Sequence, residues 1–115
     1  MKYQIIIIPF LPALGMALFP FILVKTNALK NNYQVILHEK IHLTQQGEML
    51  ILPFYIVYLF HYLINLIRFK NHTKAYLNIV FEKEAYAMDK YPDYLQQRRF
   101  WAWREFLAPN SSKRF

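Results

Sequence analysis

Two histidines and a glutamate stand together in the segment His38-Glu39-Lys40-Ile41-His42, an H-E-x-x-H arrangement. In a helix, a spacing of four residues places both imidazoles on one face, about 40° apart, because each residue turns the helix by about 100°. Two imidazole nitrogens can then converge on one Zn²⁺ ion. Glu39 lies about 100° round the helix from His38, where it can reach a metal-bound water rather than the metal. The arrangement favours hydrolysis, in which the ion lowers the pKa of the water and Glu39 takes its proton.

A catalytic zinc site needs a third protein ligand, and the chain contains no cysteine that could supply it. The candidates are Glu82 and Glu84, which point to opposite sides of a later helix because they lie two residues apart. Ala85 and Tyr86 share the side of Glu82, so a second helix can approach there and the Tyr86 hydroxyl can orient an imidazole. Glu84 lies on an apolar side, where burial would require a partner such as a metal. The spacing allows only one of them to serve, the residues beside Glu82 favour it, and Glu84 remains the alternative ligand.

The helix that carries the histidines has recognisable ends. Asn31 or Asn32 can cap it, and no proline follows until Pro53, so we predict a helix over residues 33–51. Pro53 fits the first turn of a second helix, predicted over residues 53–68, which is apolar all round.

Two further helices and a strand-like segment complete the predicted fold. The carboxylates Glu82 and Glu84 fall in a third helix over residues 74–90, and aromatic and basic residues fill a fourth over residues 93–107. The apolar N-terminal segment, residues 1–30, contains prolines that would break a helix, so we expect short strands there, two in number.

Length and composition limit the class of protein. The 115 residues allow one small domain, residues 1–115, and the absence of cysteine excludes disulfides and thiol chemistry. We therefore expect a mainly α fold, a compact helical domain of about four helices with a short N-terminal β element. The net charge of +7 could attract nucleic acid, but no nucleic-acid-binding motif accompanies it, so no nucleic-acid partner is expected. The sequence gives no indication of the oligomeric state.

The apolar segments 4–24 and 49–67 raise the question of a membrane. If residues 49–67 crossed a bilayer, the histidines and the carboxylates would be separated by about 30 Å of hydrocarbon, whereas zinc bonds are about 2 Å long. A complete site therefore requires the chain to reverse near Pro53. We expect a compact domain that is membrane-associated, and otherwise cytoplasmic.

The H-E-x-x-H motif and the phrase Phe81-Glu82-Lys83-Glu84-Ala85-Tyr86-Ala87 together resemble gluzincin zinc metallopeptidases. The phrase is similar to the F-E-x-x-A-D-A segment of CAAX prenyl endopeptidases and heat-shock membrane metalloproteases. Most of the chain also resembles small bacterial H-E-x-x-H proteins. The resemblance implies Zn²⁺ held by His38, His42 and Glu82, Glu39 as general base, and a peptide or protein substrate. Tyr86 occupies the place of the family's usual aspartate.

The alternative function is a membrane-associated structural or interaction protein whose motif binds metal without catalysis, or binds none.

Overall fold

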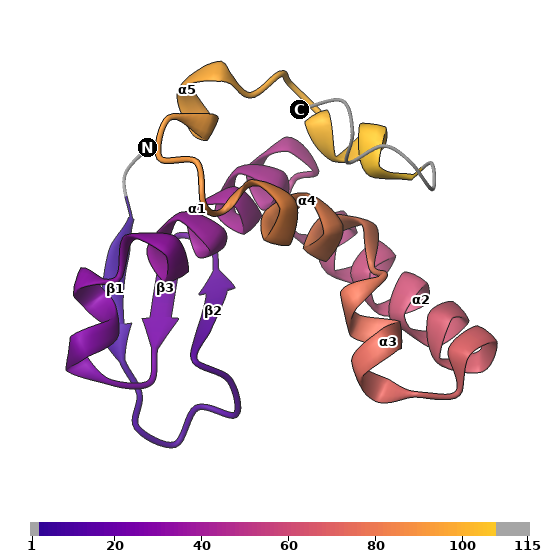
Figure 1. Ribbon diagram of the computed structural model, residues 1–115, viewed down its shortest axis with the longest axis horizontal. Helices are drawn as coiled ribbons and strands as arrows, with labels where there is room; N and C mark the ends of the chain where they lie inside the picture. The colour runs from indigo at the N-terminus through magenta and orange to yellow at the C-terminus, as the bar shows by residue number, and fades with distance from the viewer. Residues whose placement is uncertain (1–2, 108–115) are drawn as a thin grey trace.

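A small sheet at one end of the molecule is joined to a group of helices that cross over one another (Figure 1). The computed structural model describes residues 3–107. In chain order the elements are β1 (Gln4–Ile7), β2 (Gly15–Leu18), β3 (Phe21–Val24), η1 (Asn27–Asn31), α1 (Tyr33–Glu48), α2 (Leu52–Phe69), α3 (His72–Leu77), α4 (Val80–Met88), α5 (Tyr94–Gln97) and η2 (Ala102–Phe106). The prediction of a mainly α fold with a short N-terminal β element is confirmed.

The sheet has three strands rather than the two expected from the sequence. Its order is β1-β3-β2, with β1 parallel to β3 and β2 antiparallel to it. Gln4 is paired with Phe21 and Gly15 with Val24. The third strand was missed because the segment between β1 and β2 holds two of the prolines that argued for short, broken structure. Since β2 is paired on one side only, its free edge faces the helices.

Helix α1 begins and ends on local features of the sequence. The Asn32 side chain accepts hydrogen bonds from the backbone of Gln34 and Val35, as predicted for a cap. The helix ends at Glu48, three residues earlier than predicted, because Leu50 (φ 58°) and Ile51 (φ 68°) reverse the chain.

The reversal between α1 and α2 is a tight γ-turn. The amide of Leu52 donates to the carbonyl of Leu50 over 2.8 Å, with Ile51 between them at φ 68° and ψ −71°. Pro53 stands within the first turn of α2 and does not itself make the reversal. After the turn the start of α2 lies near α1, with the Phe54 ring centroid 6.4 Å from that of His42, and α3 and α4 then return toward the histidines.

The predicted helix over residues 74–90 is two helices, α3 and α4, that change direction at Asn78 and Ile79. A residue of another helix stabilises this break, because the Val80 amide donates to Nδ1 of His61 on α2 over 3.1 Å. Burial, together with the positive charges of Lys83 and Arg68, lowers the pKa of His61, which keeps this acceptor nitrogen free of a proton. Helix α4 then lies against α1 (Figure 1).

The predicted helix over residues 93–107 is likewise interrupted, into α5 and η2. Arg98 is extended, and its guanidinium binds the carboxylates of Glu48 and Glu84. Trp101 has φ 62° and donates its amide to Glu48 over 2.7 Å. These contacts with the two carboxylates prevent a continuous helix over residues 93–107. The 3₁₀ helix η2 that follows packs on α4.

A core of aromatic rings locks α4 in place. Phe81 is fully buried, and its ring centroid lies 4.5 Å from that of Phe54 on α2 and 5.1 Å from that of Trp103 in η2. Ile41 of α1 is buried in the same cluster. Because Phe81 precedes Glu82, this packing also determines where the Glu82 carboxylate lies.

Replacing Leu50 by glycine tests whether the reversal is strained. Leu50 is 80% exposed, so the change removes little buried surface, and glycine adopts positive φ freely. We expect Leu50→Gly to raise the free energy of unfolding by about 1 kcal/mol in chemical denaturation. The matched control, Leu52→Gly, changes a residue that is 66% exposed within α2 and should lower it by about 0.5 kcal/mol. Equal losses in both variants would contradict a strained turn.

Candidate metal centre

His38 and His42 lie one helical turn apart on α1 and face the same side. Their ring centroids are 4.9 Å apart and both side chains are buried. The predicted common face of the two imidazoles is therefore confirmed, as their spacing of four residues requires.

Glu82 on α4 joins the two histidines in a group of three side chains that could hold a metal ion. Its Oε1 atom lies 3.2 Å from Nε2 of His38 and 3.0 Å from Nε2 of His42. One ligand atom from each residue falls within 4.8 Å of the others. Tetrahedral ligands at about 2 Å from a zinc ion are themselves about 3.3 Å apart, and the distances from Glu82 to the two imidazoles match this spacing.

Both imidazoles are also hydrogen-bonded through Nδ1, the ring nitrogen that does not face Glu82. Nδ1 of His38 donates to Oδ2 of Asp89 over 2.9 Å, and Nδ1 of His42 donates to Oε1 of Gln45 over 2.8 Å. The Gln45 oxygen must be the acceptor, because the amide nitrogen donates to Phe81 and Glu84. Nε2 of each ring is therefore the nitrogen that faces Glu82, as metal-binding histidines require.

Asp89 and Gln45, the hydrogen-bond partners of the two histidines, were not predicted from the sequence. Asp89 lies seven residues after Glu82, about two helical turns, so periodicity could have placed both on one face. Gln45 follows His42 by three residues on the same helix, and the same argument applies. Tyr86, which was expected to orient an imidazole through its hydroxyl, instead packs its ring edge-on against His38 at 4.5 Å. The Tyr86 hydroxyl is hydrogen-bonded to the Tyr76 hydroxyl over 3.0 Å.

The Glu82 carboxylate is held by a third helix as well. Its second oxygen, Oε2, accepts a hydrogen bond of 2.7 Å from the hydroxyl of Tyr58 on α2. Burial and the charge of Glu82 raise the pKa of Tyr58, so the hydroxyl keeps its proton and remains a donor. Tyr58 was not predicted as a site residue, because a tyrosine in an apolar helix carries no local indication of its partner.

The charges in the group are coupled. Burial alone would lower the pKa of His42, but the charge and hydrogen bond of Glu82, with the charge of Glu39, raise it to about 9. Burial would raise the pKa of Glu82, yet the positive charge of His42 and the hydrogen bonds from both imidazoles hold it well below its ordinary value. Glu82 is therefore an ionised carboxylate facing nitrogens, which is the form that binds a cation.

Glu39 lies beside this group and against the edge of the sheet. A Cβ atom at Gly15 would be 3.1 Å from Oε2 of Glu39, so the glycine leaves just enough room for the carboxylate next to β2. Burial raises the pKa of Glu39, although the positive charges of His42 and His38 oppose the rise. The neutral form of this carboxyl group is therefore favoured more than it would be in water.

The group of His38, His42 and Glu82 opens into a cavity of about 250 Å³. Its walls come from β2, α1, α2 and the helices that follow, and its lining includes His38, Glu39, His42 and Glu82. The ring of Phe54 and the side chains of β2 make the rest of the wall largely apolar. A ligand in this cavity would therefore contact the predicted metal ligands and Glu39 at once.

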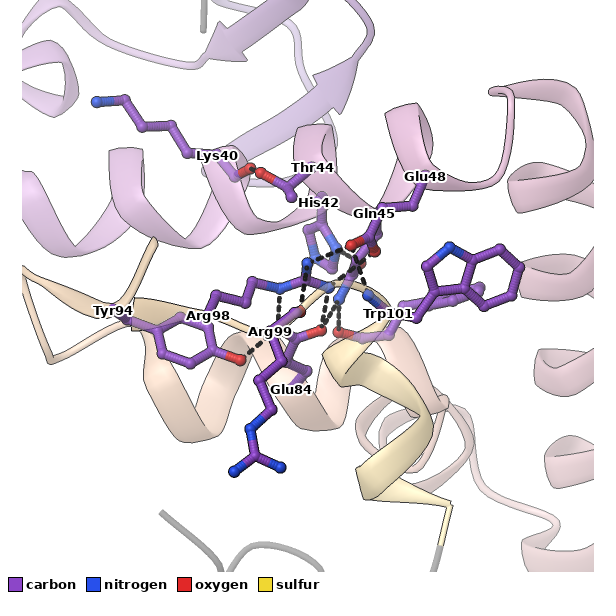
Figure 2. Close-up of polar contacts among 11 residues, drawn as sticks. Lys40, His42, Thr44, Gln45, Glu48, Glu84, Tyr94, Arg98, Arg99 and Trp101 are labelled. Carbon is purple, nitrogen blue, oxygen red and sulfur yellow. Dashed lines mark hydrogen bonds and ion pairs between the residues drawn. The ribbon is translucent and has the colours of Figure 1, made fainter. Parts of the chain in front are cut away.

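Glu84, the alternative third ligand, lies on the opposite side of α4. Its carboxylate binds the guanidinium of Arg98 and the hydroxyl of Tyr94, and accepts from Gln45 over 2.9 Å (Figure 2). The expected partner of a buried Glu84 is thus an arginine and not a metal. Gln45 links this carboxylate to His42, because the Gln45 amide nitrogen donates to Glu84 and its oxygen accepts from His42.

The chain matches no known protein family, no curated protein and no solved structure. What the site can do is therefore inferred from its own residues and their geometry.

The two carboxylates of α4 should have separable effects. Glu82→Gln removes a charged ligand and should lose most of the bound zinc, measured by elemental analysis after dialysis. Glu84→Gln should keep the zinc but lower the free energy of unfolding by about 3 kcal/mol, because Arg98 is left without one of its carboxylates. Equal zinc contents in the two variants would exclude Glu82 as a ligand.

The hydrogen bond behind His38 can be tested separately from the ring that packs on it. Asp89→Ala removes the acceptor of Nδ1 and should weaken zinc binding by about tenfold or more, measured by competition with a chromophoric chelator. Tyr86→Phe keeps the ring and should change the affinity by less than about twofold. The opposite order of effects would contradict the assignment of Asp89.

Proposed function

We propose that this chain is a zinc-dependent hydrolase of peptide bonds. The observation that supports the proposal best is the position of Oε1 of Glu82, which lies within hydrogen-bonding distance of Nε2 of both His38 and His42. Two imidazoles and a carboxylate, each fixed by further hydrogen bonds, are the ligand set of catalytic zinc sites that keep one position open.

The residues of the chain have distinct parts in the proposed reaction. His38, His42 and Glu82 hold the ion, which supplies a Lewis acid when bound. Hydrolysis forms a bond between the oxygen of water and the carbonyl carbon, and it breaks the carbon–nitrogen bond. Glu39 takes the proton from the water and passes it to the departing nitrogen. Gly15 keeps the Glu39 carboxylate close to the ligands by leaving space beside β2.

The walls of the cavity are compatible with an extended peptide as substrate. β2 is an edge strand of the sheet and lines the cavity, so its unpaired edge offers backbone groups to a neighbouring extended chain. Part of this edge is already occupied, because Gln46 binds the Ala17 carbonyl over 2.9 Å and the Phe19 amide over 3.0 Å. A peptide would therefore pair near Gly15 and Met16, next to Glu39. The choice of peptides over other amides comes from the resemblance to gluzincins.

A metal site that only stabilises the fold is the second candidate function. It is favoured by the position of the ligands, since two come from α1 and one from α4, so that a bound ion would link the two helices. In that case the chain would be a structural or interaction protein. Zinc content alone does not separate the two candidates, whereas the role of Glu39 does.

Glu39→Gln distinguishes the hydrolase from the structural protein. Protein purified without chelator should contain about one zinc ion per chain, and His38→Ala and His42→Ala should lose it. Glu39→Gln should keep the zinc, while hydrolysis of a broad peptide library falls by roughly a hundredfold or more. Glu105→Gln, a carboxylate remote from the site in η2, is the matched control and should retain full activity. Zinc-loaded native protein that cleaves no peptide would favour the structural role.

A further inference from the structure

Helix α2 has its polar side chains turned inward. Between Leu52 and Ile67, each tyrosine, histidine and asparagine forms a hydrogen bond with another part of the chain, and the residues concerned are Tyr55, Tyr58, His61, Tyr62 and Asn65. Asn65, for example, is buried and donates to the Ala75 carbonyl over 3.2 Å. In a helix at the surface of a water-soluble protein the polar side chains face outward, so the arrangement in α2 is the reverse of the usual one.

The opposite side of α2 is apolar and uncovered. This outer face consists of Leu52, Ile56, Val57, Leu59, Phe60, Leu63, Ile64 and Ile67, all of them exposed. The sequence has no Asp, Glu, Lys or Arg from Leu52 to Ile67, and only 11% of the helix is buried. The face runs along a helix of 18 residues, about 27 Å long. Contiguous apolar surfaces of this kind mark a contact with a partner or a membrane.

Charge decides between a membrane and a second copy of the chain. Beyond the end of the outer face, Arg68, Lys70 and Lys74 are exposed, and the sequence has no acidic residue between Glu48 and Glu82. This cluster of basic residues would attract the phosphates of anionic lipids. A second copy would bring the same positive charges to the contact, and the chain as a whole carries +7.

We propose that the outer face of α2 docks into the surface of a bilayer that contains anionic phospholipids. The helix lies along the boundary between water and hydrocarbon rather than crossing it. Crossing would surround the helix with lipid, whereas its inner side is hydrogen-bonded along its length to β2, α3 and α4. Docking in the plane leaves these contacts intact, covers the apolar side chains, and places Arg68, Lys70 and Lys74 at the level of the headgroups.

The first experiment measures binding of the full chain to vesicles by flotation. The vesicles are phosphatidylcholine alone, or phosphatidylcholine mixed with phosphatidylglycerol at about two to one. Native protein should float with the mixed vesicles and roughly tenfold less with the neutral ones. The variant Phe60→Glu with Ile64→Glu should lose binding by roughly tenfold or more. Tyr33→Glu, which places a charge at an exposed aromatic residue on α1, is the matched control and should bind like the native chain.

The basic cluster is tested by a second set of variants. Replacing Arg68, Lys70 and Lys74 together by glutamine should weaken flotation with the mixed vesicles by roughly tenfold or more. The matched control replaces three other exposed lysines, at positions 25, 30 and 90, and alters the net charge equally. If the two triple variants lose binding equally, net charge and not the end of α2 is responsible, and the proposed orientation is wrong.

A labelling experiment keeps the proposal testable if a charged variant fails to fold. The chain has no cysteine, so Phe60→Cys and Tyr33→Cys each provide a single site for an environment-sensitive fluorophore. On addition of mixed vesicles, the label at position 60 should shift to the blue and the label at position 33 should not. No shift at position 60 would overturn the proposal. A dimer of the native chain in sedimentation without lipid would also overturn it, if the Phe60→Glu, Ile64→Glu variant were a monomer. The outer face would then be the contact with a second copy.

Discussion

Burial of one carboxylate, that of Glu82, governs the arrangement of the helices around it. An ionised carboxylate removed from water costs several kcal/mol unless charged or hydrogen-bonding partners surround it. Glu82 is only 4% exposed, and its partners are two imidazoles from α1 and a hydroxyl from α2. Three helices must therefore meet at this side chain. The reversal at Leu50 and Ile51 and the break before Val80 are the features of the chain that allow them to do so.

The two carboxylates of α4 show how the surroundings assign different roles to the same chemical group. Glu82 faces nitrogens that can release a proton and accept a metal, whereas Glu84 faces the permanent charge of Arg98. Gln45 joins the two sides, since its oxygen accepts from His42 and its nitrogen donates to Glu84. Figure 2 shows this connection, with Arg98 between Glu84 and the carboxylate of Glu48. The ion pair on one side of α4 thus contributes to the rigidity of the site on the other.

Sequence reasoning succeeded where the physical cause is local. The mainly α fold, the cap at Asn32 and the common face of His38 and His42 all follow from contacts within a few residues. The interruptions of the two later helices could not be predicted, because they depend on His61 and Arg98, whose partners are distant in the sequence. The choice of Glu82 or Glu84 as the third ligand was equally hard to predict, because it also depends on partners distant in the sequence. Periodicity placed them on opposite sides but could not show which side held the arginine.

Helix α2 connects the proposed membrane contact to the proposed reaction. Within it only Phe54 and Asn65 are fully buried, so hydrogen bonds from its inner side contribute alongside aromatic packing to holding the helix in place. Such bonds contribute about 1 kcal/mol each to stability. The apolar outer face contributes no stability while it is exposed to water. Covering the outer face would therefore stabilise the position of the whole helix. Because Tyr58 holds Glu82 and Phe54 lines the cavity, a better-fixed α2 means a better-fixed site.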